Sequence, residues 1–156
     1  MAIPVKPVPD GYHVVNPLLV VNDAARAIEF YTVVFGATER SRLVGPGGKI
    51  AHAELSIGDS VIMLADEFPD WGDVGPKSYG HSPVRLILYV RDVDALASRA
   101  VGFGAKMLLA VADQFYGDRS GRLEDPFGHL WIISTHKEDV SPEEMHRRME
   151  ALSKRT

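Results

Sequence analysis

The sequence contains no cysteine, which excludes disulfides, cysteine-ligated zinc and a thiol nucleophile. It also contains no run of 18 apolar residues, the length that a membrane-spanning helix needs. The opening stretch MAIPVKPVPDGYH has no apolar segment of signal-peptide length. Together these absences favour a cytoplasmic protein and predict that no membrane is among its partners.

An excess of basic residues is also missing. The chain has 17 Lys and Arg against 21 Asp and Glu, so its formal net charge is -4 with the six histidines neutral. Nucleic-acid binding needs a basic face, and we therefore expect no nucleic-acid partner. The chain has 156 residues, of which 46% are hydrophobic and 24% charged, which is typical of a globular protein with a single domain.

One pattern of residues occurs twice in the chain. Each copy has an apolar strand that ends in V-x-D, then an apolar helix stripe, then F-G-A; the copies lie at 21–37 and 90–105. Aspartate caps the start of a helix, and glycine suits the left-handed residue that ends one. Strands are expected at 14–21, 37–44, 49–57 and 60–65, and again at 84–90, 106–112, 117–124 and 129–135. The sequence therefore predicts two βαβββ modules.

These elements predict the organisation of the whole chain. We expect a single domain over 1–156, with a first module at 12–66, a connecting loop at 67–82, a second module at 83–137 and a C-terminal amphipathic helix within 138–156. Residues 1–12 are proline-rich and read as an extended arm. The terminal helix carries a capping box, Ser141 with Glu144, and Pro142 at its first position.

The connecting loop is rich in glycine, proline and acidic residues, and it also carries Phe68, Trp71 and Tyr79. Long connections are often lids or binding loops. The alternative is a plain linker whose aromatic side chains pin it to the body of the protein. The sequence leaves both interpretations open.

The densest group of charges lies in 116–131, YGDRSGRLEDPFGHLW, which predicts a hairpin with a tight turn at 125–128. Asp118 and Arg119 could grip a polar ligand, because arginine offers a planar fork to carboxylate or phosphate. Tyr116 and Trp131 could stack on an aromatic ligand. The alternative is a structural hairpin with cross-strand pairs and a tryptophan in the core.

His52 and Glu54 are two residues apart on a predicted strand, so they share one face. Such a pair could be a general base with its orienting carboxylate, or it could be half of an alternative metal site that Glu124 completes. A structural pair on a polar strand face is the competing interpretation.

The duplicated module resembles the vicinal-oxygen-chelate superfamily, which includes glyoxalase I, bleomycin-resistance proteins and extradiol dioxygenases. The resemblance covers 12–136 and is carried by A-x-E-F-Y-x-x-V-F-G-A at 27–37 and E-D-P-F-G-H-x-W at 124–131. With G-D-R at 117–119 and H-A-E-L at 52–55, the chain is similar to the PhnB-like subgroup. The resemblance implies an α+β fold, with two βαβββ modules forming a curled mixed sheet around a small-molecule cavity, and a homodimer.

Metal-dependent members of that superfamily carry one ligand on the first strand and one on the last strand of each module. The resemblance places these positions at Asn16, at Ile62 or Met63, at Arg85 and at Ile132. Apolar side chains cannot hold a hard cation and arginine repels one, so only Asn16 could be a weak ligand. We therefore expect no metal and no cofactor, and we expect Arg85 to point inward, buried against a carboxylate or an anionic ligand.

The leading hypothesis is a metal-free small-molecule-binding protein of the bleomycin-resistance kind, with ligand contacts from Arg85, Tyr116, Asp118, Arg119 and Trp131. A second hypothesis is a lyase or isomerase of the same superfamily. It would act on a small oxygenated substrate through His52, Glu54 and Glu124, with or without a displaced divalent metal. A third is an interaction module that grips a partner through its terminal helix.

Overall fold

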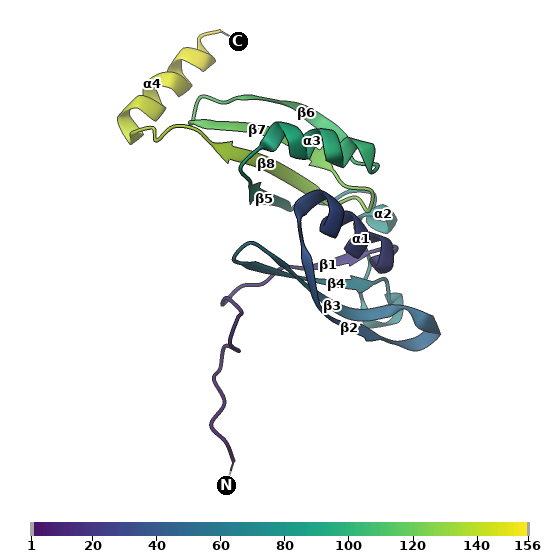
Figure 1. The fold of residues 1–156 in the computed structure, drawn as a ribbon. Helices are drawn as coiled ribbons and strands as arrows, with labels where there is room; N and C mark the ends of the chain where they lie inside the picture. The colour runs from purple at the N-terminus through teal and green to yellow at the C-terminus, as the bar shows by residue number, and fades with distance from the viewer. Residues whose placement is uncertain (1, 156) are drawn as a thin grey trace. The chain divides into compact units, whose positions relative to one another are not determined.

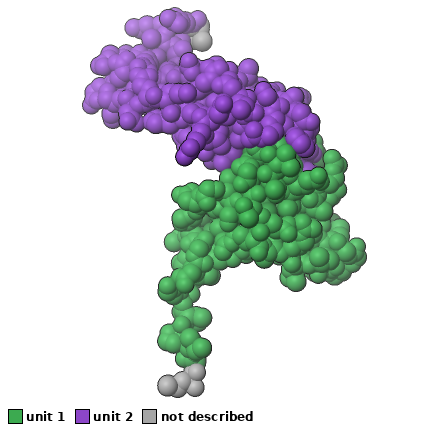
Figure 2. Space-filling view, viewed as in Figure 1, with its two compact units in different colours: residues 1–82 green, residues 83–156 purple. Residues whose placement is uncertain are grey.

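The computed structural model describes residues 2–155, which form two mixed four-stranded sheets, each with its own helix, and a C-terminal helix (Figure 1). The predicted α+β class with two βαβββ modules is confirmed. The chain divides into two compact units, unit 1 up to Ser82 and unit 2 from Pro83 onward (Figure 2). The assembly of both modules into one domain stays a prediction.

Unit 1 has the sheet order β1-β4-β3-β2, in which β1 runs parallel to β4 and the other pairs are antiparallel. Its elements are β1 (Leu18–Val21), α1 (Ala24–Phe35), β2 (Thr38–Val44), β3 (Ile50–Ile57), β4 (Ser60–Asp66) and the short helix α2 (Pro76–Tyr79). Single turns of 3-10 helix lie at Pro46–Gly48 and Pro69–Trp71.

Unit 2 repeats this topology with the order β5-β8-β7-β6, again with one parallel pair, β5 with β8. Its elements are β5 (Arg85–Tyr89), α3 (Val93–Gly102), β6 (Lys106–Asp113), β7 (Asp118–Glu124), β8 (Leu130–His136) and α4 (Pro142–Ser153).

The helix ends follow the predicted chemistry. The Asp23 side chain accepts a hydrogen bond from the Arg26 amide at 3.2 Å, and Asp92 accepts one from the Ala95 amide at 3.0 Å. Each aspartate thereby satisfies a backbone donor that has no partner inside the helix. Gly36 ends α1 in the left-handed conformation with φ 71°, as predicted.

A side chain at the end of the last strand of each module holds the adjacent helix. Asp66 accepts from the Ala24 amide at 2.8 Å, and Thr135 accepts from the Val93 amide at 3.0 Å. The two partners are 42 residues apart in both units. Because each tie fixes the helix against one side of its sheet, each sheet has a helix-covered face and an open face.

The helix-covered faces contain the core. In unit 1 the largest fully buried side chains include Tyr31, Leu55 and Leu64, and in unit 2 they include Leu123 and Ile133. Strand residues alternate between the two faces, so the neighbours of these core residues lie on the open face.

The first strand begins later than the predicted residue 14. Asn16 folds back on His13, accepting from its amide at 3.1 Å and donating to its carbonyl at 2.7 Å. This local turn competes with strand pairing, so β1 begins only at Leu18.

The predicted connecting loop is folded onto unit 1. Glu67 accepts from the Gly75 amide at 2.9 Å and from the Ser78 hydroxyl at 2.8 Å. The Phe68 ring stacks on Trp71 with centroids 4.5 Å apart, and the Lys49 ammonium lies 4.9 Å from the Phe68 centroid. The hydrogen bonds accepted by Glu67 and the stacking of Phe68 on Trp71 hold this segment in a defined conformation.

Ser141 caps the terminal helix as predicted, since its hydroxyl accepts from the Glu144 amide at 3.2 Å, but the Glu144 carboxylate accepts from Arg147 and Arg148 instead of the reciprocal bond expected for a capping box. Arg148 links it to the rest of unit 2, donating to the Phe115 carbonyl at 3.0 Å and to Glu138 at 2.6 Å. No helix in the described part of the chain has the length and apolarity needed to cross a membrane.

Gly117 provides a test of how the segment after β8 is held. The Gly117 carbonyl accepts from the amides of Lys137 and Glu138, both at 3.0 Å. Its φ is 99°, and a Cβ there would lie 2.2 Å from the Glu138 carbonyl oxygen. We expect Gly117→Ala to lower the free energy of unfolding by about 2–4 kcal/mol, measured by urea denaturation.

Gly102 is the matched control, because a Cβ at that helical position meets nothing within 4 Å. Gly102→Ala should raise stability by about 0.5–1 kcal/mol, since alanine is the better helix former. Equal stability of the two variants would contradict the packing described for Gly117.

Candidate functional site

The open face of unit 2 is defined by strand register. Going across the sheet, Arg85, Leu130 and Glu124 lie in one row, and Ile87, Ile132 and Arg122 lie in the next. Tyr89, Ser134 and Ser120 follow, and the last row pairs His136 with Asp118. Ile87 is 60% exposed, whereas Ile133 on the helix-covered face is fully buried.

A hollow of about 180 Å³ lies at the end of this face where β5 and β8 begin. It is lined by Arg85, Leu108, Leu109, Arg122, Leu123, Leu130 and Trp131. Arg85 was expected to be buried against a carboxylate or an anionic ligand, but it is exposed on the open face of unit 2. Within residues 2–155, neither Arg85 nor Arg122 has a side-chain hydrogen bond or an ion pair.

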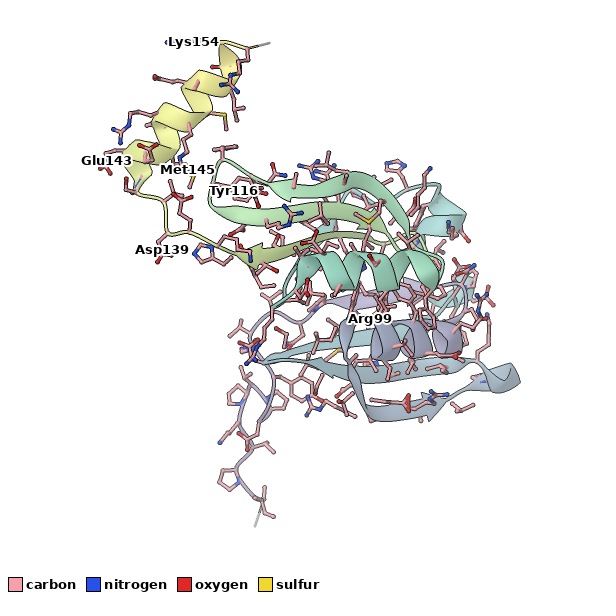
Figure 3. All side chains as sticks on the ribbon, turned by 45° about the horizontal axis from the view of Figure 1, so that its top comes forward. Arg99, Tyr116, Asp139, Glu143, Met145 and Lys154 are labelled. Carbon is pink, nitrogen blue, oxygen red and sulfur yellow. The ribbon has the colours of Figure 1, made fainter. Side chains whose placement is uncertain are left out.

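The opposite end of the same face carries a chain of polar side chains. Asp118 is only 6% exposed, and it accepts from the Tyr89 hydroxyl at 3.1 Å and from His136 Nδ1 at 2.7 Å. His136 Nε2 lies 2.7 Å from Asp139, on the segment leading into α4 (Figure 3). The hydrogen bond to Asp139, and then that to Asp118, raises the pKa of His136.

Asp118 is thus occupied by internal partners rather than left free to grip a ligand. Neither His136 nor Tyr89 was among the predicted site residues. A hairpin symmetric about the predicted 125–128 turn would place residue 118 opposite residue 135, but the loop between the paired residues Glu124 and Leu130 has five residues, so Asp118 lies opposite His136.

Two predicted ligand contacts lie on the helix-covered side instead. Arg119 makes a bidentate ion pair with Asp94 of α3, at 2.7 and 2.9 Å. Trp131 borders the hollow but is only 3% exposed, and its indole donates to Asp125 at 2.9 Å. The ring of Trp131 is buried in the core, and its role as a stacking platform stays a prediction.

Tyr116 lies before β7, at the opposite end of the sheet from the hollow (Figure 3). Its ring meets Phe115 edge-on, with centroids 5.2 Å apart. Of the five predicted ligand contacts, unit 2 therefore places only Arg85 on the open face at the hollow, with Glu124 in the same row.

The open face of unit 1 brings together the predicted pair His52 and Glu54, whose nearest atoms are 3.2 Å apart. Glu54 also accepts a hydrogen bond from the Tyr12 hydroxyl, and the Arg40 guanidinium lies 5.0 Å from the Tyr12 ring centroid. The hydrogen bond from Tyr12, with a further contribution from His52, lowers the pKa of Glu54. The same bond raises the pKa of Tyr12.

Tyr12 was not predicted as a site residue because it lies in the proline-rich arm. The arm has no hydrophobic periodicity from which the direction of a side chain could be predicted. Glu124 belongs to unit 2, where its register partners are Leu130 and Lys106. The structure thus brings His52 and Glu54 into contact within one unit and places Glu124 in the other.

The positions at which the resemblance places metal ligands do not have side chains that fit a divalent cation. Asn16 is engaged with His13, Ile62 is 5% exposed on the helix-covered face, and Met63 faces Glu54 across the strands. Arg85 and Ile132 supply no ligand atom. Within residues 2–155, no group of three or more His, Cys, Asp or Glu side chains could hold a metal ion.

His136 generates a prediction about pH. Its pKa is raised above the ordinary value of 6.5, so its contribution to stability is complete below that pH and is lost as the pH rises through the folded-state pKa. The stability difference between the wild type and His136→Gln should therefore be largest near pH 6 and shrink toward pH 9, measured by urea denaturation across roughly this range. A difference that grows with pH would contradict the assignment.

With the geometry established, comparison with known proteins gives the family. The sequence model of the Glyoxalase/Bleomycin resistance protein/Dioxygenase superfamily matches residues 12–133. The uncharacterized protein Mb0911c of Mycobacterium bovis is 41% identical over 152 residues, which is 96% of each chain.

Solved structures agree on the fold. The crystal structure of TioX from Micromonospora sp. ML1 has a TM-score of 0.61 at 26% identity, over 83% of this chain and all of that one. The PhnB protein from Bacillus cereus, described as a putative 3-demethylubiquinone-9 3-methyltransferase, has a TM-score of 0.64 at 16% identity. That likeness covers 79% of this chain and 99% of the other, and it shows the fold alone. The predicted superfamily is confirmed: this chain belongs to the Glyoxalase/Bleomycin resistance protein/Dioxygenase superfamily.

Proposed function

We propose that this protein binds a small organic molecule without the help of a divalent metal. The observation that carries the proposal is the pair Arg85 and Ile132, at the positions where the resemblance places metal ligands in module 2. Both lie on the open face of unit 2, in adjacent rows. A guanidinium repels a cation and an isoleucine has no donor atom, so this face suits an organic ligand and not a metal.

The apolar surface of the same face supports the proposal. Ile87 and Tyr89 are 60% and 61% exposed, and Leu108 and Leu109 at the hollow are 49% and 47% exposed. Neighbouring exposed apolar side chains mark binding surfaces in soluble proteins. A homodimer is part of the proposal, since a second copy would cover apolar strand residues that the ligand leaves exposed.

Metal titration tests the proposal directly. A divalent metal that binds the folded state with a Kd of about 10 µM would, at about 1 mM, stabilise it by roughly 2.7 kcal/mol. We expect no such shift in the unfolding midpoint with Ni²⁺, Zn²⁺ or Mn²⁺, and no loss of stability with EDTA. A metal-induced rise that disappears in His52→Ala would overturn the proposal.

A second candidate is a lyase or isomerase reaction on the open face of unit 1. The observation that favours it is the linked series Tyr12, Glu54 and His52. Glu54, ionised through its lowered pKa, would orient His52 as a general base toward a small oxygenated substrate. Glu124, which belongs to unit 2, has no part in this candidate.

The state of Glu54 can be measured without a substrate. Tyr12→Phe removes the donor that contributes most to its lowered pKa, so we expect the pKa of Glu54 to rise, followed by NMR of its carboxyl carbon. Tyr79→Phe is the matched control, because Tyr79 is 70% exposed and should leave Glu54 unchanged. A Glu54 titration identical in Tyr12→Phe and the wild type would remove Tyr12 from this series.

A further inference from the structure

We infer that the hollow on the open face of unit 2 binds an organic anion with a compact apolar body, and that Arg85 and Arg122 hold its negative charge. This inference rests on the proposed function and deepens it by naming the class of ligand. It is carried by the charges, the shape and the lining of one site within unit 2.

The first observation is the pair of unpartnered guanidinium groups. Arg85 is on β5 and Arg122 on β7, one row apart, with β8 between them. Two strand spacings separate them by roughly 10 Å across the sheet, a span that two long arginine side chains can close. Since neither arginine has a side-chain partner within residues 2–155, both forks are available to a carboxylate, sulfonate or phosphate.

The second observation is the local balance of charge. Lys106 is the register partner of Glu124, so the two rows that contain Arg85 and Arg122 hold three cations and one carboxylate. Glu124 makes contacts of its own. The chain as a whole has a net charge of -4, so this positive excess is a property of the site and not of the protein.

The third observation concerns the apolar wall. Strand β6 is irregular, with register shifts between Met107 and Leu109 and between Leu109 and Ala112. These shifts leave the consecutive residues Leu108 and Leu109 both half-exposed, although a regular strand would turn one of them away. Both leucines line the hollow together with Leu130.

A glycine allows this irregular strand to approach its neighbour. A Cβ at Gly121 would lie 3.0 Å from the Leu109 carbonyl oxygen and 2.9 Å from the Val111 side chain. Gly121 is on β7, directly before Arg122. Strand β6 therefore lies close to β7 at Leu109, which is the register partner of Arg122.

The size of the hollow restricts the apolar body. At about 180 Å³ the hollow is close in size to a cavity of about 150 Å³ that binds benzene, so it has room for a ring system but not for a long chain. An aromatic or branched acid fits this description, with its ring against the leucines and its anionic group at the arginines.

Three naphthalene compounds with different charges test the inference on the full-length protein. They are 1-naphthoate, 1-naphthalenemethanol and 1-naphthylmethylammonium, with binding measured by isothermal titration calorimetry. We expect 1-naphthoate to bind at least about tenfold more tightly than the alcohol and the ammonium compound to bind most weakly. The affinity for 1-naphthoate should also fall as salt is added, because the site is open to solvent.

Two variants and one control locate the effect. Arg85→Gln and Arg122→Gln should each weaken 1-naphthoate by about tenfold and leave the alcohol within about twofold, since each removes a charge-assisted contact from an exposed position. Arg26→Gln, on the exposed side of α1 in unit 1, removes the same charge elsewhere and should change neither affinity.

The results separate this inference from the proposed function. If the alcohol binds as tightly as 1-naphthoate and the arginine variants have no effect, the anionic class is overturned while small-molecule binding stands. If none of the three compounds binds, the inference is also overturned, and the metal titration decides the proposed function independently.

Discussion

The hydrogen bond that the first amide of each helix donates to a strand side chain is the constraint on which the rest of the structure depends. Asp66 accepts it from the Ala24 amide, and Thr135 accepts it from the Val93 amide. Both side chains are buried, so loss of the acceptor would leave a helix amide without a partner. The tie decides which face of each sheet the helix covers, and so which side chains remain free for chemistry.

The two open faces have the same topology and different contents. Unit 1 presents a connected polar series, Tyr12, Glu54 and His52, anchored by a residue from the N-terminal arm. Unit 2 has two separate groups of polar side chains, the Asp118–His136 pair at one end of the sheet and the arginines at the hollow at the other. The same topology therefore presents two different sets of side chains.

Most of the fold could be predicted from the sequence because its signals are local. The V-x-D and F-G-A repeats marked both helices, and strand periods located the strands to within a residue or two, apart from the start of β1. That start was wrong because the bonds between Asn16 and His13 override the apolar pattern of 14–17. Side-chain capping of this kind depends on local geometry, which hydrophobic periodicity does not report.

The candidate site was harder to predict because it depends on faces and partners. Period-2 reasoning correctly put His52 beside Glu54. Charge density in 116–131 was misleading, because Arg119 and Asp118 are adjacent in sequence and therefore point to opposite faces. Arg119 thus pairs with Asp94 of the helix, and Arg122, two strands away from Arg85, received no role. The sequence of a strand does not predict which side chains from other elements will bond to it, as Tyr12 of the N-terminal arm bonds to Glu54.

Both partners of each hydrogen bond that orients a helix belong to the same unit, and this has an evolutionary consequence. Because Asp66 and Ala24 both belong to unit 1, and Thr135 and Val93 both to unit 2, each copy keeps the groups that orient its own helix. Substitutions on one open face leave those groups intact in both copies. A lineage could therefore exchange a metal ligand for an arginine in one half of the gene, and so acquire a new ligand, without rebuilding the frame that presents it.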